Sequence, residues 1–220
     1  MNRRAVIFDL DGVLVSTDEF HYRAWKQMAS EENIPFSRSV NEKLRGISRM
    51  ESLEIILKNS SKKYSPSQKA DLAERKNCYY KKLLEGLSPE SVLPGVLDLL
   101  DGLKQQRFQI AVGSSSKNAP YILQKTGLDR FFDAAVDGSE IRKSKPDPEV
   151  FLLAAKKLGV PPGSCVVVED APAGILAAKA GGMAAVGIGS ASSCALADWT
   201  AKSLQEAKAS DFIGIFQSLR

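Results

Sequence analysis

The chain has 220 residues, 44% of them hydrophobic and 25% charged, which suffices for one sizeable core with a small inserted domain. The net charge of +4 is mild. Because the Lys and Arg residues form no stripe interleaved with aromatic residues, a small anionic ligand is a better expected partner than nucleic acid. The three cysteines lack metal-binding spacing, and no apolar run suits a signal segment or a membrane span. We therefore expect a cytoplasmic protein with free thiols and no membrane partner.

The apolar run Ala5–Phe8 predicts a short buried strand, which is broken at Gly12. Two carboxylates, Asp9 and Asp11, follow the run directly. Residues two apart on an extended chain point the same way, so both side chains should leave the strand tip together. Such close like charges repel one another, and a bound divalent cation is the usual remedy. Carboxylate oxygens are hard ligands that suit Mg²⁺. The alternative interpretation is that Asp9 and Asp11 belong to a solvated turn and bind no metal.

Residues 16–90 are rich in Lys, Glu, Ser and Gln and contain no convincing strand. Helical periodicity is found instead around residues 20–32, 50–58 and 67–86. Pro89 closes this stretch. We expect two domains: a core formed by residues 1–15 and 91–220, and a helical cap formed by residues 16–90 that is inserted into it.

The rest of the chain alternates between strand-like and helix-like segments. Strands are predicted at residues 109–113, 134–136, 165–168 and 184–188. Helices are predicted near residues 95–106, 118–126, 149–158 and 171–180, with a closing helix near 209–219. Asp147 and Pro148 are typical of the N-cap and first residue of a helix. This alternation predicts an α/β fold, a doubly wound parallel sheet with the helical cap inserted after its first strand.

Polar residues follow the predicted strands, at the sheet edge where doubly wound folds bind ligands. Ser114, Glu169 and Asp170 each come just after a strand. Lys145 is expected in a loop, because Pro146 disfavours a helical conformation for the residue before it. Each group has an alternative interpretation without a role in a site. Ser114 could cap a helix, Lys145 could be solvated, and Glu169 and Asp170 could be acids in a surface turn. Together these groups supply the carboxylates, hydroxyl and ammonium that phosphoryl transfer requires.

Four separated motifs in this chain resemble those of the haloacid dehalogenase superfamily, namely Asp9-x-Asp11-Gly12, Ser114, Lys145-Pro146 and Glu169-Asp170. The resemblance implies a Rossmann-like catalytic core with a helical cap, residues 16–90, that sets substrate specificity. It implies Asp9 as the nucleophile that forms an aspartyl-phosphate, and Asp11 as the general acid/base. Ser114 and Lys145 would hold the transferring phosphate. The implied ligands of Mg²⁺ are Asp9, the Asp11 carbonyl, Glu169 and Asp170.

A second set of motifs lies in the cap and in the core loop after the second strand, at Asn41-Glu42-x-Leu44-Arg45-Gly46-Ile47-Ser48-Arg49 and Ser114-Ser115-Ser116-Lys117-Asn118. These resemble superfamily members that interconvert β-glucose 1-phosphate and glucose 6-phosphate, with β-glucose 1,6-bisphosphate as intermediate and activator. The resemblance implies that Arg49, Ser116 and Asn118 hold the phosphate that is not reacting. The other substrate-binding residues it implies are Thr17, His21, Trp25, Arg45, Gly46, Ile47, Ser48, Ser52, Lys76, Ser115 and Lys117. Thr17 would also hold Asp11 until the cap closes.

Two positions depart from the superfamily pattern, since Ser16 stands where Asp is usual and Arg45 where Lys is. A sugar-phosphate phosphatase is the alternative function, because it would share the core motifs and use water as the acceptor. A catalytically silent binding protein is a third possibility. His21 and Trp25 share one helical face and could equally be structural. The expected partner is a small-molecule sugar phosphate, and the chain is expected to be a monomer.

Overall fold

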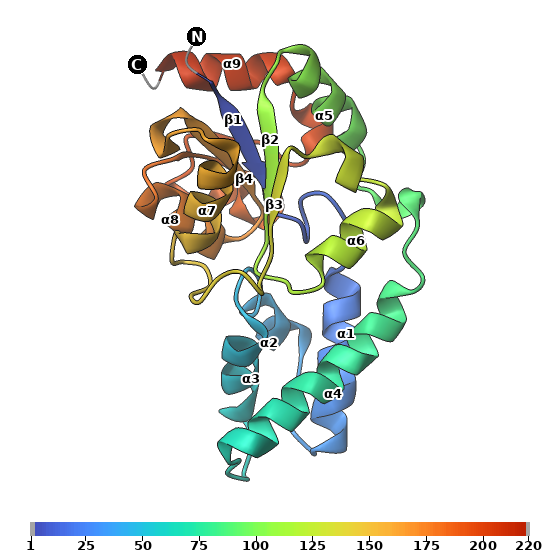
Figure 1. Ribbon diagram of the computed structural model, residues 1–220. Helices are drawn as coiled ribbons and strands as arrows, with labels where there is room; N and C mark the ends of the chain where they lie inside the picture. Colours follow the sequence, from blue (N-terminus) through green and yellow to red (C-terminus); the bar gives the residue numbers. More distant parts are fainter. Residues whose placement is uncertain (1–2, 219–220) are drawn as a thin grey trace.

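The computed structural model describes residues 3–218, and its strands form one parallel sheet in the order β3-β2-β1-β4-β5-β6 (Figure 1). The strands are β1 Ala5–Phe8, β2 Gln109–Gly113, β3 Ala134–Val136, β4 Cys165–Glu169, β5 Ala184–Gly187 and β6 Trp199–Thr200. Every pair of neighbouring strands is parallel. The predicted α/β fold with a parallel sheet is confirmed.

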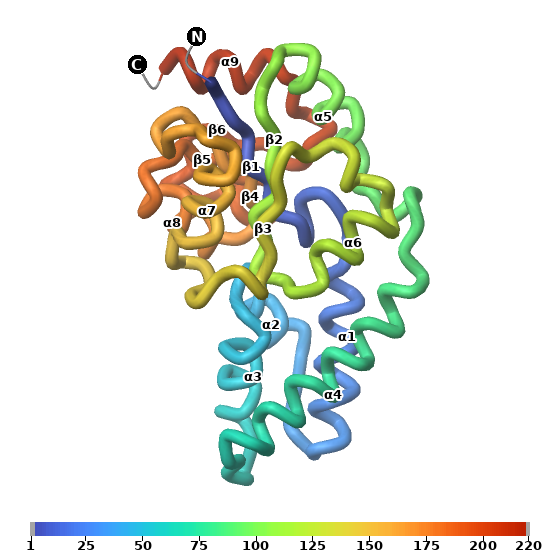
Figure 2. Tube along the Cα trace, viewed as in Figure 1, coloured from blue at the N-terminus to red at the C-terminus, as the bar shows by residue number. Residues whose placement is uncertain are grey.

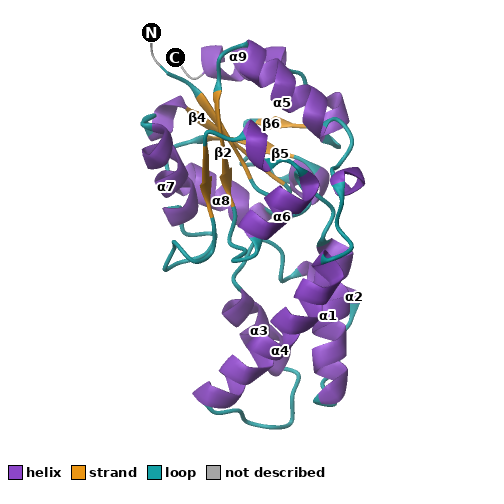
Figure 3. Ribbon diagram, turned by 45° about the vertical axis from the view of Figure 1, so that its right-hand side comes forward, coloured by secondary structure: helices purple, strands orange, loops and turns teal. Residues whose placement is uncertain are grey.

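Helices cover both faces of this sheet (Figure 3), which explains why β1 is apolar throughout and β4 is apolar up to Glu169 at its end. Val6 and Phe8 pack toward the layer that contains α5 Val96–Gln105, α6 Ala119–Thr126 and α9 Ala209–Ser218. Ala5 and Ile7 point the opposite way, toward α7 Glu149–Leu158 and α8 Pro172–Ala180. The alternation of side chains along β1 therefore divides the core into two hydrophobic layers.

The chain between β1 and α5 forms a separate helical bundle beyond one end of the sheet, as Figures 1 and 2 show. Its helices are α1 Asp18–Glu31, α2 Arg38–Glu42, α3 Arg49–Leu57 and α4 Pro66–Leu84. Trp25, Met28 and Leu53 belong to a hydrophobic cluster of the bundle itself. Ser48 and Ser65 begin α3 and α4 with capping boxes, which fix where these two helices start. We use the term cap for residues 16–90.

The structure differs from the sequence prediction at several boundaries. Helix α2 and strand β6 were not predicted, because five and two residues are too few to show a periodicity. The predicted helix near 20–32 begins earlier, at Asp18, and the predicted strand 184–188 ends at Gly187. The predicted closing helix near 209–219 is α9, and residue 219 lies outside the described residues. Short 3₁₀ turns occur at Pro89–Ser91, Asp129–Phe131, Pro162–Ser164, Gly189–Ser193 and Leu204–Glu206.

Two capping assignments also differ. The N-cap of α7 is Pro148, and Asp147 accepts a hydrogen bond from the backbone N–H of Glu149 at 3.0 Å. The N-cap of α6 is Asn118, so Ser114 does not cap that helix. Within residues 3–218, no helix has the length and apolar character needed to cross a membrane.

Candidate active site

The candidate active site lies where the strand order reverses, at the carboxyl ends of β1 and β4. The chain runs from β1 outward through β2 and β3, then returns to β4 on the other side of β1. Parallel pairing aligns Phe8 with Val168, and the Asp9 N–H donates to the Val168 carbonyl at 2.9 Å. This register brings Asp9 beside Glu169, although 160 positions separate them in the sequence numbering. Ligands of doubly wound sheets bind at such a reversal.

Three carboxylates gather at this point. Asp9, Glu169 and Asp170 are all buried, and one oxygen from each lies within 4.8 Å of the others. Gly12 has a φ of +83°, and a Cβ atom there would overlap the Asp170 carboxylate. A Cβ atom at Gly174 would overlap the Glu169 carboxylate in the same way. These two glycines therefore leave the space that the acidic cluster occupies.

Lys145 is the cation within this cluster, and its side chain is fully buried. Its Nζ donates to Asp9 Oδ1 at 2.5 Å and to Glu169 Oε1 at 2.6 Å. The second Glu169 oxygen accepts from the Ala171 N–H at 2.9 Å. Burial lowers the pKa of Lys145, but the two carboxylates raise it by more, so the ammonium stays charged. The loop position predicted for Lys145 is found, whereas the solvated alternative is wrong.

The acidic cluster fits a divalent cation. Burial, together with the charges of Glu169 and Asp9, raises the pKa of Asp170 to about 9. The raised pKa shows that the charged form of Asp170 is unfavourable beside the other two carboxyl groups, so a further positive charge at this point would stabilise it. Their oxygens are the hard ligands that Mg²⁺ prefers. In the structure the Arg45 guanidinium donates to Asp170 Oδ2 at 3.0 Å and to Asp18 Oδ2 at 2.5 Å.

The carboxyl group of Asp11 is held apart from this cluster by a hydrogen bond from the Thr17 hydroxyl. Desolvation, followed by the charge of Asp9, raises the pKa of Asp11 to about 7, although the hydrogen bond from Thr17 lowers it. A carboxyl group with such a pKa can both accept and donate a proton near neutral pH. Asp9 and Asp11 thus follow the same strand but have different surroundings, since Asp9 pairs with Lys145 and Asp11 accepts from Thr17.

A buried lysine lies on the cap side of the site. Lys76 Nζ is 3.0 Å from His21 Nδ1, and it lies 4.9 Å from the Trp25 ring centroid and 4.4 Å from that of Tyr80. Burial, followed by the positive charge of Arg49, lowers the pKa of Lys76 to about 7. Desolvation and the charge of Lys76 lower the pKa of His21, so its imidazole is neutral. His21 and Trp25 therefore face a polar group of the site, as well as packing within the cap.

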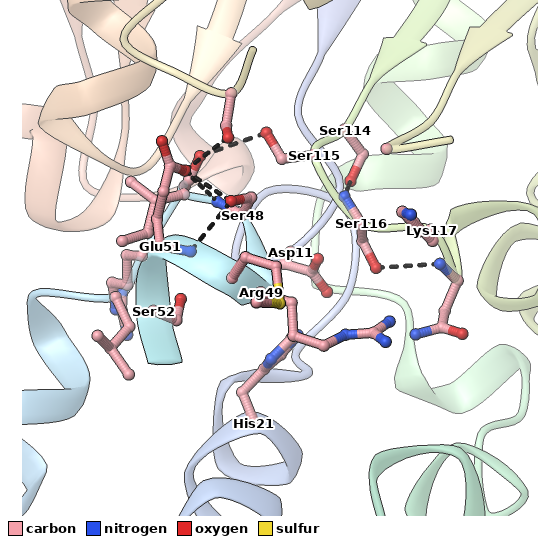
Figure 4. Close-up of a pocket in the computed structure, with 18 of the residues that line it drawn as sticks. Asp11, His21, Ser48, Arg49, Glu51, Ser52, Ser114, Ser115, Ser116 and Lys117 are labelled. Atoms are coloured by element: carbon pink, nitrogen blue, oxygen red, sulfur yellow. Dashed lines mark hydrogen bonds between the residues drawn. The ribbon is translucent and has the colours of Figure 1, made fainter. Parts of the chain in front are cut away.

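A cavity of about 610 Å³ lies between the cap and the core (Figure 4). Figure 4 shows the Arg49 side chain extending from α3 toward Ser116 on the core side. Ser114 Oγ accepts from the Ser116 N–H at 3.1 Å, and Ser116 Oγ accepts from the Asn118 N–H at 3.2 Å. This serine-rich turn thus presents hydroxyl and amide groups to the cavity opposite a guanidinium group.

Most residues that the sequence singled out line this cavity, namely Asp9, Asp11, His21, Trp25, Arg45, Gly46, Ile47, Ser48, Arg49, Ser52, Lys76, Ser114, Ser115, Ser116, Lys117, Asn118 and Asp170. Thr17, Lys145 and Glu169 lie behind this lining. Thr17 donates to Asp11, and Lys145 donates to both Asp9 and Glu169. The structure therefore brings all of these predicted residues to one place.

Polar contacts that were not predicted join the cap to the core. Glu51 Oε2 accepts from Ser144 Oγ at 2.6 Å while it also caps α3 through Ser48. Figure 4 shows Glu51 and Ser48 side by side. Asn118 Nδ2 donates to Asn77 Oδ1 at 3.2 Å. The sequence does contain a capping pattern, Ser48 followed three residues later by Glu51. This pattern predicts the start of a helix and gives no indication that Glu51 contacts the core.

A family model described as haloacid dehalogenase-like hydrolase matches residues 3–182, and the chain belongs to this family. The chain is 49% identical to a β-phosphoglucomutase of Bacillus subtilis over 84% of its own length and 83% of that protein. It is 32% identical to a phosphorylated carbohydrates phosphatase of Thermotoga maritima, over 81% of this chain and 82% of that one. The crystal structure of a β-phosphoglucomutase from Clostridium difficile superposes with a TM-score of 0.93 at 38% identity, covering 98% of each chain.

Proposed function

We propose that this enzyme interconverts β-glucose 1-phosphate and glucose 6-phosphate through an aspartyl-phosphate on Asp9 and through β-glucose 1,6-bisphosphate. The names of the relatives from Bacillus subtilis and Clostridium difficile support this assignment at high coverage. The cavity supports it as well, because a phosphate could be held at two separate places along its lining. One place is beside Ser114 and the acidic cluster, where Mg²⁺ would supply positive charge, and the other lies beside Arg49.

The core groups are proposed to carry out the transfer. Asp9 attacks the phosphoryl group, while Lys145 and Ser114 hold its oxygens. Asp9, Glu169, Asp170 and the Asp11 carbonyl would hold Mg²⁺, which supplies charge neutralisation for the phosphoryl group. Lys145 also donates hydrogen bonds to Asp9 and Glu169, so the nucleophile is oriented before the substrate arrives.

Asp11 is proposed as the general acid/base. Its pKa of about 7 suits a group that takes a proton from the attacking sugar hydroxyl and later returns one. The bond from Thr17 holds its carboxyl group away from Asp9 in this structure. Since His21 and Lys76 lie on the same side of the cavity, they would position the sugar and the Asp11 carboxyl group when the substrate enters.

The observation that carries the proposal is the second set of anion-binding groups. A mutase must hold one phosphate while it transfers the other, because the bisphosphate turns around between the two half-reactions. Arg49 extends toward Ser116 across the cavity, and Asn118 follows in the same turn (Figure 4). An Arg side chain can grip a phosphate with two parallel hydrogen bonds. We refer to Arg49, Ser116 and Asn118 as the distal phosphate site.

The cap is proposed to set substrate specificity, with Trp25, Arg45, Gly46, Ile47, Ser48, Ser52, Ser115 and Lys117 completing the sugar site. We also propose that the chain acts as a monomer, because a single chain forms the whole cavity. The alternative is a sugar-phosphate phosphatase, and the name of the Thermotoga maritima relative favours it. A phosphatase has less need of the distal phosphate site.

The variant Arg49→Ala tests this choice. Removing the distal guanidinium should lower isomerisation by about 10²-fold, since a small misplacement of a reacting group costs that much. Hydrolysis of the aspartyl-phosphate by water should persist, because the core groups are unchanged. The two measurements are glucose 6-phosphate formation and decay of the phosphoenzyme. If wild type releases free phosphate and forms no isomer, the phosphatase assignment is correct. If the variant isomerises normally, the distal phosphate site is wrong.

A further inference from the structure

The donors of the distal phosphate site already have acceptors within the chain. Arg49 Nη1 lies 3.4 Å from Glu74 Oε2. Glu74 also accepts from Asn77 Nδ2 at 3.2 Å, and Asn77 Oδ1 accepts in turn from Asn118 Nδ2 at 3.2 Å. A continuous chain of hydrogen bonds therefore runs from the guanidinium group, through two side chains of α4, to the core amide.

The elements explain how these groups meet. Glu74 and Asn77 are three residues apart on α4, so both lie on the same helix face. Arg49 is the first residue of α3, and Asn118 belongs to the core. Asn77 and Asn118 are buried, whereas 61% of the Glu74 side chain is exposed. Glu74 thus places a negative charge at the mouth of the distal phosphate site, beside the cation proposed to grip the phosphate.

We propose that Glu74 and Asn77 act as a displaceable acceptor pair, which occupies Arg49 and Asn118 until a sugar phosphate replaces it. The proposal rests on the proposed function. A phosphate and the Glu74 carboxylate compete for the same guanidinium group, so Glu74 weakens binding at this site. Such weakening suits a mutase, because each end of the bisphosphate must leave the site in every catalytic cycle. Binding the ground state more tightly would not speed the reaction.

The variant Glu74→Gln removes the charge and keeps an amide oxygen as acceptor for Arg49 and Asn77. The matched control is Glu54→Gln, which removes the same charge from α3, where Glu54 pairs with Lys69 at 2.7 Å outside the cavity. The first readout is the dissociation constant of glucose 6-phosphate from the unphosphorylated protein with Mg²⁺, which requires no turnover.

Glu74→Gln should bind glucose 6-phosphate about two- to fivefold more tightly than wild type, a size typical of an exposed ion pair. The Glu54→Gln control should match wild type. The tightening should shrink at high salt, because salt screens exposed charges. In the mutase assay, the KM for β-glucose 1-phosphate should fall in Glu74→Gln while kcat does not rise. In an Arg49→Ala background, Glu74→Gln should have no effect on binding.

The proposal is overturned if wild type isomerises the substrate and Glu74→Gln binds like wild type or like the Glu54→Gln control. It is equally overturned if Glu74→Gln tightens glucose 6-phosphate binding by the same factor in the Arg49→Ala background. The Glu74 charge would then act on the cavity as a whole and not through Arg49. If wild type neither forms the isomer nor binds glucose 6-phosphate, the proposed function itself fails, and the acceptor pair fails with it.

Discussion

The acidic cluster of the core and the distal phosphate site differ in how their charged side chains are paired. In the core, Lys145 is fully buried and donates to both Asp9 and Glu169. In the cap, Arg49 lies 3.4 Å from Glu74, a side chain that is 61% exposed. Loss of one partner of a buried ion pair costs about 3–5 kcal/mol, whereas exposed pairs contribute about 0–1 kcal/mol. The comparison indicates that the core orients its reacting groups permanently, while the distal phosphate site holds Arg49 by a contact that a ligand can replace.

The largest effect is expected for Asp9→Asn, because it removes the core nucleophile. An amide cannot form the acyl-phosphate, so both isomerisation and hydrolysis should be abolished. Glu169 still pairs with Lys145, so the variant should remain folded. The measurement is the gain in mass by one phosphoryl group after incubation with acetyl phosphate and Mg²⁺. Formation of a phosphoenzyme by the pure variant would show that another residue is the nucleophile.

Asp170→Asn should separate metal binding from stability in the core. The folded-state pKa of Asp170 is about 9 against an ordinary 3.8, so the folded protein holds this proton more tightly than the unfolded chain. Without metal, the free energy of unfolding of wild type should therefore fall as the pH rises between these values. The free energy of unfolding of Asp170→Asn should not fall in this way. The variant should therefore be more stable than wild type at pH 8 when a chelator removes metal ions.

Mg²⁺ at 100 times its dissociation constant should then stabilise wild type by about 2.7 kcal/mol and the Asp170→Asn variant much less. Thermal unfolding with chelator and with Mg²⁺ measures both effects. Asp18→Asn is the control, because Asp18 is another acidic partner of Arg45 and lies outside the acidic cluster. An equal response to Mg²⁺ in wild type and Asp170→Asn would exclude Asp170 as a ligand.

A smaller effect is expected where the cap meets the core at Ser144. Ser144→Ala removes the hydrogen bond that the Ser144 hydroxyl donates to Glu51, and it leaves the capping box between Ser48 and Glu51 intact. Looser contact with the cap should admit water, so the ratio of isomer to free phosphate should fall about three- to tenfold. Ser144→Thr should restore it. Ser139→Ala, which removes a hydroxyl bonded to Asp137 in a nearby loop, should leave the ratio unchanged. An unchanged ratio in Ser144→Ala would mean that this contact has no part in excluding water.

The core was easier to predict from the sequence than the cap. Strand β1 is buried on both faces, so its apolar run is visible without knowledge of its neighbours. The burial of Lys145 could not be predicted from local sequence, since its partner Asp9 is 136 positions away. Glu74, Glu51 and Ser144 carry no local signal of a role in the site. Glu51 and Ser144 meet only because the cap lies against the core in three dimensions. Glu74 meets Arg49 because α4 and α3 lie side by side within the cap.

The fate of the phosphoryl group on Asp9 tests the central claim most directly. Wild-type protein carrying a radiolabelled phosphoryl group on Asp9 is mixed with β-glucose 1-phosphate in the presence of Mg²⁺. The label is then followed through a single turnover. If the distal phosphate site orients the sugar, most of the label should appear in glucose bisphosphate and then in glucose 6-phosphate. Release of the label as free phosphate at the same rate with and without the sugar phosphate would contradict the proposed mutase function.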